Sequence, residues 1–383
     1  MRRFGVLLVL VTWLLAGAEA SARSEAVQVA VVRLGEYGSL TGTDGGFGTD
    51  VHDGIVLAVE ELNAAGGLAL GATKAHVELL TEDDHSRRED VEPAVAKLLA
   101  ARVPLVLGGT SSSLSQIGAA ACQRAHVPML APAATLPALT AAGDCVFRAC
   151  YVDTQQGEAM ARYARERLKA KTAGLLVENS SEYSRTLADA FAAAFRAHGG
   201  TVAREETYSR KDLDFKSQLA ALHQAGAEVL YVPGLCTQVA QIANQAKDTG
   251  LPAIFLGGDG WDSPRFRELG GAAVLGAFFT NHYSPLEKRP EVEAFVAAFR
   301  KRYQRVPTAP AALGYDAARL AADAIARAGS AEPAAVRAAL AATKAFHGVT
   351  GAIALDAHRD AAKPVVVVEV TADGYEPRDV VQP

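Results

Sequence analysis

Residues 27–67 read VQVAVVRLGEYGSLTGTDGGFGTDVHDGIVLAVEELNAAGG, and this stretch contains the first copy of the pattern that decides the fold. The apolar run 27–32 predicts a β-strand, and residues 49–64 space their apolar side chains as a helix does. Gly66-Gly67 then end the predicted helix. Between strand and helix, residues 38–48 are too many for a simple turn. A strand, a polar loop and a helix in this order form one unit of an α/β fold.

The same alternation recurs along most of the chain. Further strands are predicted at residues 75–81, 103–107, 127–130, 144–150, 172–178, 201–207, 227–232, 252–257 and 273–281. Helices are predicted between them at residues 89–101, 113–125, 154–168, 184–198, 214–225 and 236–249. This βαβα order predicts parallel sheets with helices on both faces, and the strands are too many for one comfortable sheet. We therefore expect two lobes.

The last third of the chain has a different pattern. Three helices are predicted almost consecutively, at residues 290–303, 309–328 and 333–342, and a strand follows at 364–370. Such a tail can return across a domain boundary and make both lobes discontinuous. No long Pro/Ser linker separates two halves, which favours lobes joined by short crossovers.

Composition excludes several classes of protein. The chain has 383 residues, of which 50% are hydrophobic and 21% charged, with a formal net charge of -5. Half of the chain can enter a core, which argues against disorder. A weakly negative protein offers no cationic field for nucleic acid.

The N-terminus is typical of a secretory signal peptide. Met1 to Arg3 is basic, residues 4–15 are almost wholly apolar, and small residues at 18–22 predict cleavage after residue 20 or 22. The apolar run is shorter than the roughly 20 residues that span a bilayer. Removal of residues 1–20 leaves 36 basic and 42 acidic residues, a net charge of -6. The first cysteine is Cys122, so we expect a periplasmic protein that is not lipid-anchored.

Four cysteines occur, at positions 122, 145, 150 and 236. Cys145 and Cys150 lie five residues apart on one predicted strand and point to opposite faces, so they cannot pair with each other. A disulfide between Cys122 and one of these two is the expectation. No Cys/His spacing indicates zinc. The chain also lacks Gly-x-Ser-x-Gly, HExxH, GxGxxG and P-loop motifs, so we expect no enzyme, metal or cofactor.

Polar loops follow the predicted strands and point to ligand binding. Residues 108–113 open a helix, and backbone N–H groups at a helix start can hold a carboxylate. The alternative is that Ser111 merely caps the helix. Asp259 follows another apolar strand, where it could meet a cationic group; the alternative is an Asp that stabilises a turn. A lobe that holds a carboxylate opposite a lobe that carries an acid would clamp a zwitterion.

The ordered set of segments resembles one family over essentially the whole mature chain. It is similar to the periplasmic binding proteins of the branched-chain amino acid (leucine/isoleucine/valine) type, the solute-binding components of ABC importers. The segments that carry the resemblance are 38–68, 78–86, 107–113 (LGGTSSS), 127–135 (VPMLAPAAT), 146–157 (VFRACYVDTQQG), 255–264 (FLGGDGWDSP), 313–325 and 346–356.

The resemblance implies two Rossmann-like lobes with parallel sheets, joined by three hinge crossovers that let the lobes close over a ligand. It implies a first lobe of residues 27–148 and 282–352, and a second of 149–281 and 353–383. The partners would be a small amino-acid-like ligand and the permease subunits of the importer, with no nucleic acid. We expect a monomer.

The resemblance also assigns roles within the site. Ser111 and Thr135 would hold the ligand α-carboxylate, and the Ala133 carbonyl with Asp259 would bind the α-ammonium. Tyr183 would cover the ligand. Phe47 and Cys236 would line the side-chain pocket, whose size we expect to depend also on Tyr151, Leu235 and Trp261.

Two departures from the family bear on the ligand. Leu235-Cys236 stands where many relatives have a Tyr, and the acid is Asp259 where some have the longer Glu. The expected ligand is an aliphatic or other hydrophobic amino acid, and the alternatives are an amide, urea or an aromatic acid. A receptor that senses the ligand is the alternative to transport.

Overall fold

The computed structural model describes residues 30–382, so the predicted signal peptide lies outside the described residues. The strands are β1 (Ala30–Gly38), β2 (Leu68–Leu70), β3 (Thr73–Asp83), β4 (Val106–Gly108), β5 (Met129–Ala131), β6 (Val146–Arg148), β7 (Thr172–Glu178), β8 (Thr201–Tyr208), β9 (Val229–Tyr231), β10 (Ile254–Gly257), β11 (Phe278–Asn281), β12 (Phe346–Gly348), β13 (Gly351–Ile353), β14 (Val365–Val370) and β15 (Tyr375–Val381). The α-helices are α1 (Gly45–Ala64), α2 (Arg88–Ala100), α3 (Ser112–Ala125), α4 (Asp153–Glu166), α5 (Glu182–Ala197), α6 (Lys216–Gln224), α7 (Cys236–Thr249), α8 (Pro264–Gly270), α9 (Pro290–Tyr303), α10 (Ala309–Ala328) and α11 (Pro333–Ala341).

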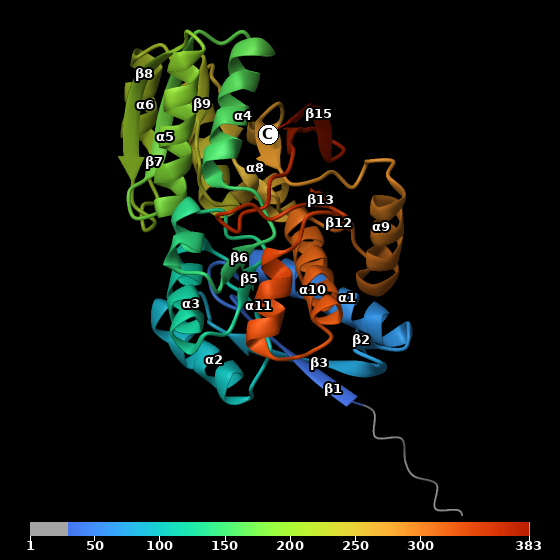
Figure 1. Cartoon of the computed structure of the whole chain (residues 1–383). Helices are drawn as coiled ribbons and strands as arrows, with labels where there is room; N and C mark the ends of the chain where they lie inside the picture. Colours follow the sequence, from blue (N-terminus) through green and yellow to red (C-terminus); the bar gives the residue numbers. More distant parts are fainter. Residues whose placement is uncertain (1–29, 383) are drawn as a thin grey trace, which may run out of the picture.

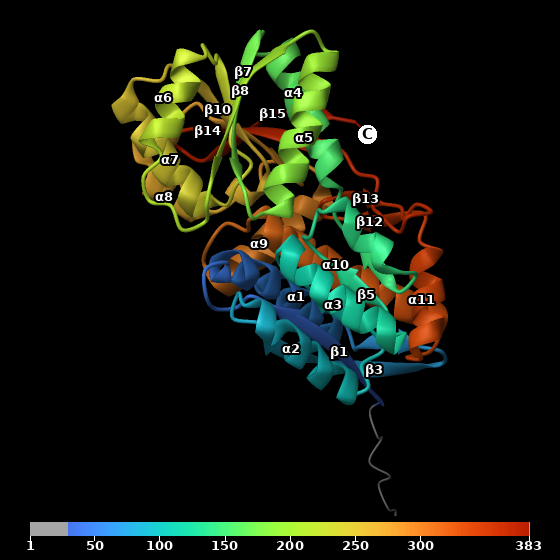
Figure 2. The ribbon, with the colours of Figure 1, turned by 90° about the vertical axis from the view of Figure 1, so that its left-hand side faces the viewer.

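The first lobe is built on a six-stranded sheet with the order β2-β3-β1-β4-β5-β6. Its pairs are parallel except for the short edge strand β2. One core cluster joins the sheet to α1, α9, α10 and α11, and a second joins it to α2 and α3. Helices therefore cover both faces of this sheet (Figures 1 and 2).

The second lobe is built on a seven-stranded sheet with the order β15-β14-β11-β10-β9-β7-β8. The strands from β11 to β8 are parallel, whereas β14 and β15 add an antiparallel edge. Helices α4 and α5 pack on one face, and α6, α7 and α8 pack on the other. The α/β fold with two lobes is as predicted, but each sheet carries antiparallel strands at an edge.

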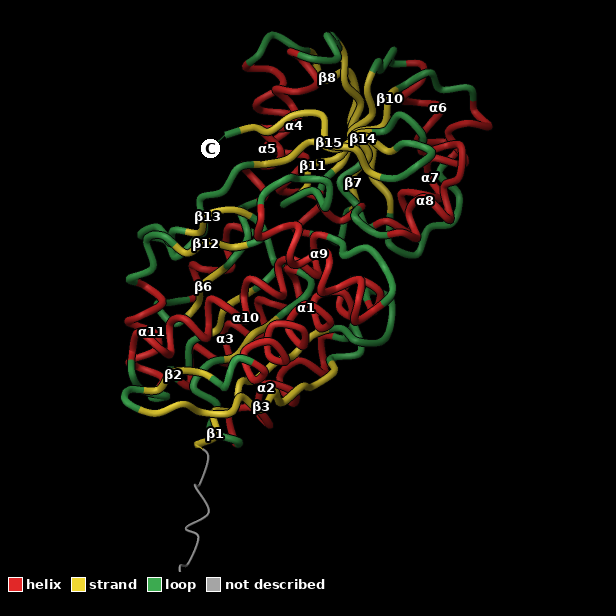
Figure 3. The backbone as a smooth tube through the Cα atoms, turned by 90° about the vertical axis from the view of Figure 1, so that its right-hand side faces the viewer, coloured by secondary structure: helices red, strands yellow, loops and turns green. Residues whose placement is uncertain are grey.

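The chain passes between the two sheets three times. It crosses between β6 and α4, between β11 and α9, and between β13 and β14. Figure 3 shows the β12–β13 hairpin at the junction of the lobes. Polar contacts join the first and third passages: Lys363 Nζ donates to the Ala149 carbonyl at 3.2 Å, and Arg148 Nε donates to Asp360 Oδ1 at 2.7 Å.

The expected disulfide is absent, because all four cysteines are free. Cys145 and Cys150 flank the short strand β6 rather than lying in one strand. The Cys145 thiol lies 3.7 Å from Asp144 Oδ1, and the Cys150 thiol lies 3.5 Å from the Ala134 carbonyl. Each thiol thus has a polar neighbour other than Cys122, and the predicted bridge was wrong.

Several strands also differ from the prediction, because β2, β12, β13 and β15 were not predicted and one predicted strand is shorter. Residues 273–277 end a 3₁₀ turn and form a loop, so only 278–281 form a strand. The last strand, β15, was not predicted, because its alternation of charged and apolar residues follows a loop with several turn-forming residues. Among residues 30–382, no helix has the length and apolar character needed to cross a membrane.

Candidate functional site

A cavity of about 460 Å³ lies between the lobes, where the carboxyl ends of strands from both sheets meet. All seven residues predicted for the site line this cavity: Phe47, Ser111, Ala133 and Thr135 from the first lobe, and Tyr183, Cys236 and Asp259 from the second. Ligands of open α/β sheets bind at this edge. The volume is typical of a small-molecule pocket.

The first-lobe wall contains the N-terminus of α3. Ser111 is the N-cap residue, but its side chain forms no capping hydrogen bond. Its buried Oγ has no hydrogen-bond partner among the described residues. The N–H groups of the first turn have no partner within a helix, and the helix dipole favours an anion beside them. This wall can therefore accept a carboxylate.

Ala133 and Thr135 belong to the loop that follows β5. Both residues line the cavity although they are buried, with 5% and 1% of their surface exposed. The Thr135 carbonyl accepts a hydrogen bond from the Asp153 N–H at 2.9 Å, which ties this loop to the start of α4 in the second lobe. The loop thus connects the cavity to the first crossover.

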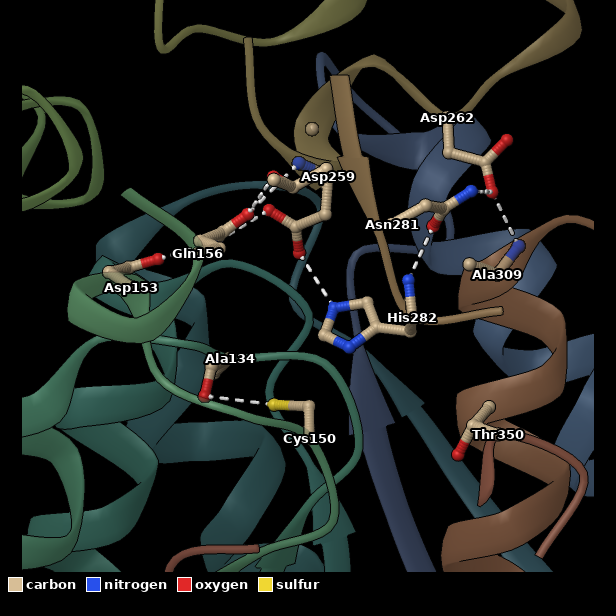
Figure 4. Close-up of polar contacts among 12 residues, drawn as sticks. Ala134, Cys150, Asp153, Gln156, Asp259, Asp262, Asn281, His282, Ala309 and Thr350 are labelled. Atoms are coloured by element: carbon tan, nitrogen blue, oxygen red, sulfur yellow. Dashed lines mark hydrogen bonds and ion pairs between the residues drawn. The ribbon is translucent and has the colours of Figure 1, made fainter. Parts of the chain in front are cut away.

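The second-lobe wall centres on Asp259, which follows β10 (Figure 4). Its Oδ1 accepts hydrogen bonds from Gln156 Nε2 at 3.0 Å and from the Tyr183 hydroxyl at 2.8 Å. Its Oδ2 lies 3.0 Å from His282 Nε2. A carboxylate has about four acceptor positions, so one remains for a ligand after these three bonds.

The electrostatics of this group favour an ionised Asp259. Burial alone would raise the pKa of its carboxyl, but the hydrogen bond and charge of His282, with the bonds from Gln156 and Tyr183, lower it. Burial lowers the pKa of His282, and its hydrogen bond with Asp259 and the charge of that carboxylate raise it in part. His282 also stacks on Tyr151 with ring centroids 3.8 Å apart, which fixes its plane.

A second buried carboxyl, Asp153, lies behind Asp259. Gln156 Nε2 donates to Asp153 Oδ1 at 2.9 Å as well as to Asp259, so one amide bridges the two acids (Figure 4). Burial, followed by the charge of Asp259, raises the pKa of Asp153 to about 7. Two like charges so close cannot both ionise easily, so Asp259 is the ionised member of the pair.

Tyr183 joins the acid to the backbone of its own loop. Its hydroxyl donates to Asp259 and accepts a hydrogen bond from the Gly260 N–H at 3.0 Å. The tyrosine lies in the first turn of α5, where Ser181 caps the helix by accepting from the Ser184 N–H at 3.2 Å. The ring therefore has a fixed position in the cavity wall.

The apolar part of the lining consists of Phe47, Leu213, Leu235 and Cys236. Burial raises the pKa of the Cys236 thiol, which keeps it neutral. Tyr151 and Trp261 were expected to limit the pocket but do not line it. Both are fully buried, and Trp261 Nε1 donates to the Val232 carbonyl at 3.2 Å beneath the cavity floor.

Two polar contacts join the lobes beside the cavity. Arg210, which follows β8, forms an ion pair with Asp44 at the start of α1. Gln116 in α3 donates to Glu182 at the start of α5, with Nε2 and Oε2 3.0 Å apart. These contacts place the described structure in a conformation whose lobes touch.

Several residues of this site were not predicted from the sequence. They are Gln156 and His282, which are partners of Asp259, and the cavity-lining Arg210 and Glu178. A signal was present, because His282 directly follows a strand and Glu178 ends one. Among the described residues, no cluster of three His, Cys, Asp or Glu side chains could hold a metal ion.

Comparisons with known proteins agree with this geometry. A family model described as periplasmic binding protein matches residues 31–375. The Leu/Ile/Val-binding protein homolog 3 of Brucella melitensis is 32% identical over 251 residues, which are 65% of this chain and 67% of that protein.

Two solved structures share the fold over most of the chain. The leucine binding protein LivK of Thermotoga maritima is 33% identical, with a TM-score of 0.87, and the match covers 92% of this chain and 99% of that one. The branched-chain amino acid transporter substrate binding protein LivJ of Streptococcus pneumoniae, solved in complex with isoleucine, is 29% identical with a TM-score of 0.86. That match covers 92% of this chain and 100% of the other.

Proposed function

The chain belongs to the periplasmic binding protein family, and from this premise we propose that it captures an aliphatic or other hydrophobic amino acid and delivers it to an ABC importer. One observation carries the proposal. A single cavity has an unpartnered hydroxyl and a helix N-terminus on one wall, and an ionised acid on the other. Burial of a zwitterion is favourable only when both of its charges are paired.

In this proposal each end of the ligand has its own wall. The α-carboxylate accepts from the Ser111 hydroxyl, the Thr135 hydroxyl and the first N–H groups of α3. The α-ammonium donates to Asp259 Oδ2 and to the Ala133 carbonyl. Tyr183 covers the ligand and holds Asp259, and the apolar side chain packs against Phe47 and Cys236.

The mechanism is closure without covalent chemistry, so the protein is a binding protein and not an enzyme. Each lobe supplies half of the ligand's partners, so the ligand stabilises the closed state by its differential affinity. The two bodies that we propose to move are the lobes implied by the resemblance, with the last boundary shifted from residue 352 to residue 361, because Leu355 and Ala361 pack in the first lobe's core. Among the described residues these bodies are 30–148 with 282–361, and 149–281 with 362–382.

The proposal includes a location and partners. Residues 1–20 would direct export and be removed, and the mature protein would be a periplasmic monomer without a lipid anchor. Its closed form would dock on the permease subunits of the importer. A receptor for a sensory system remains the alternative, and genes for a permease and an ATPase next to the gene for this protein would favour transport.

The test uses mature protein that has been unfolded and refolded to remove bound ligand. Calorimetry should detect binding of L-leucine, and of its matched analogues 4-methylpentanoate, which lacks the ammonium, and leucinamide, which lacks the carboxylate. We expect each analogue to bind at least about 100-fold more weakly, because it leaves a buried polar group unpaired. Tight binding of benzoate or of an amide, with none of leucine, would contradict the amino-acid assignment.

A variant tests the role of the acid. Asp259→Ala should weaken leucine binding by about 2–5 kcal/mol, the usual cost of leaving a buried charge unpaired. Asp259→Asn keeps the side-chain shape and isolates the charge. Unchanged affinity in both variants would mean that the ammonium is bound elsewhere.

A further inference from the structure

Glu178 is a buried acid at the cavity that recognition of the α-amino and α-carboxyl groups does not use. It is the last residue of β7, has 5% of its surface exposed and lines the cavity. Its Oε1 accepts a hydrogen bond from the Ser180 hydroxyl at 3.0 Å. No basic side chain of residues 30–382 forms an ion pair with it. A buried carboxylate without a cation is costly unless a ligand or water supplies donors.

The sheet order fixes where Glu178 lies relative to Asp259. In the second sheet β10, β9 and β7 are consecutive neighbours. Asp259 follows β10, the segment of Leu235 and Cys236 follows β9, and Glu178 ends β7. Neighbouring strands are about 4.8 Å apart, so the two acids stand roughly 10 Å apart along the cavity edge. The apolar segment lies between them.

The cavity lining as a whole carries a net negative charge, as Glu178 itself does. Five acidic residues line it (Asp44, Glu178, Glu182, Asp212 and Asp259), against two basic ones (Arg210 and Arg265). Arg210 is already paired with Asp44. A net negative cavity with an unpaired acid at its far end attracts a cationic group rather than a second carboxylate.

We infer that Glu178 forms a second polar subsite, which accepts amino acids whose side chain ends in a cationic donor. This inference rests on the proposed amino-acid function. A ligand such as lysine or ornithine would place its α-ammonium at Asp259, lay its methylene chain over Leu235 and Cys236, and donate its terminal ammonium to Glu178. An aliphatic amino acid would fill the apolar part and leave Glu178 to water.

The experiment compares two ligands of similar length in the ligand-stripped mature protein. L-lysine and L-norleucine differ mainly in the terminal ammonium group, so the ratio of their Kd values isolates the far subsite. Calorimetry on the wild type should give lysine an affinity at least equal to that of norleucine. Glu178→Gln should weaken lysine about tenfold or more and change norleucine less than about twofold.

Glu182→Gln is the matched control, because Glu182 is also an acid of the cavity lining but receives the Gln116 amide. It should leave the lysine-to-norleucine ratio unchanged. A wild type that binds norleucine or leucine but binds lysine about 100-fold more weakly would overturn the subsite and leave the proposed function intact. Equal effects of Glu178→Gln on both ligands would also overturn it. A protein that binds none of these amino acids would overturn both proposals.

Discussion

Asp153 is the residue whose environment makes the clearest prediction about pH. It is fully buried behind the site, and its pKa is raised to about 7 by burial first and then by the charge of Asp259. The hydrogen bond from Gln156 and the charge of Arg148 lower that pKa in part. An unfolded aspartate titrates near pH 3.9. The folded state therefore binds more protons than the unfolded state between about pH 4 and 7, and its stability falls as pH rises through that window.

Asp153→Asn removes this titration but keeps the shape of the side chain. As the pH rises from 4.5 to 8, we expect the free energy of unfolding of the wild type to fall relative to that of the variant by about 2–4 kcal/mol. Urea unfolding of the ligand-free proteins at several pH values measures the difference. Parallel stability curves for the two proteins would show that Asp153 is ionised throughout.

At the residue scale the sequence could predict residues that line the cavity but not how they are held. Ser111 and Asp259 each follow a strand in a βα order, and this order alone brings each of them to the carboxyl edge of its own sheet. The partners of Asp259 come from distant positions, since Gln156 lies 103 residues away along the chain and His282 lies 23. No local pattern encodes such distances, and the sequence therefore could not predict the network.

Among the elements, the packing of α1 against α10 depends on two glycines. A Cβ at Gly54 would lie 1.9 Å from the Ala311 carbonyl oxygen, and one at Gly314 would lie 2.1 Å from the Val51 carbonyl oxygen. The two helices approach closely because neither has a side chain at these points. We expect Gly54→Ala to lower the free energy of unfolding by about 1–3 kcal/mol, since overpacking forces the helices apart.

Gly46→Ala in the same helix is the control, because a Cβ there would meet nothing within 4 Å. It should be neutral or raise stability by about 0.4–1 kcal/mol, through loss of backbone freedom in the unfolded chain. Chemical unfolding of both variants decides the comparison. Equal destabilisation by the two alanines would contradict the role of close packing, because only the Cβ at residue 54 would meet the facing helix.

The elements themselves were predictable where the apolar period was long. Helices such as α1 and α7 lie within a few residues of the predicted ranges, because an amphipathic stripe or a following glycine defines them. The short hairpin β12–β13 and the edge strand β15 were missed. The hairpin strands contain glycines and β15 is rich in charged residues, so neither segment shows the buried apolar run that predicted short strands such as β5 and β9.

At the scale of the whole molecule, the sequence could indicate two lobes but not the contacts between them. The return of the chain through α9 to α11 predicted that the lobes are discontinuous, and these helices do pack in the first lobe's core. The ion pair of Arg210 and Asp44 and the bond from Gln116 to Glu182 depend on how far the lobes have closed. Interlobe contacts of this kind follow from the folded geometry alone.

The Arg210–Asp44 pair leads to a prediction about closure. Arg210 is 43% exposed and Asp44 only 5%, so solvent screens part of the attraction, and a pair of this kind contributes up to about 1 kcal/mol. Because it joins the lobes, that energy favours the closed state and slows ligand release. We expect Arg210→Gln to weaken leucine binding by up to about fivefold, mainly through faster dissociation, as stopped-flow kinetics would measure.

Lys211→Gln removes the same charge from the neighbouring residue, which is exposed and forms no ion pair with another residue in 30–382. If Arg210 acts only through its charge near the cavity, Arg210→Gln and Lys211→Gln should weaken leucine binding by the same factor. Adding Asp44→Asn should then restore the affinity of neither variant. If Arg210 acts by direct pairing, Lys211→Gln should bind as the wild type does. The double variant Arg210→Gln/Asp44→Asn should then be no weaker than Arg210→Gln, because the partner's contribution has already been lost. Small-angle scattering of the ligand-free proteins gives a second measure. The radius of gyration should be larger than that of the wild type in Arg210→Gln and unchanged in Lys211→Gln.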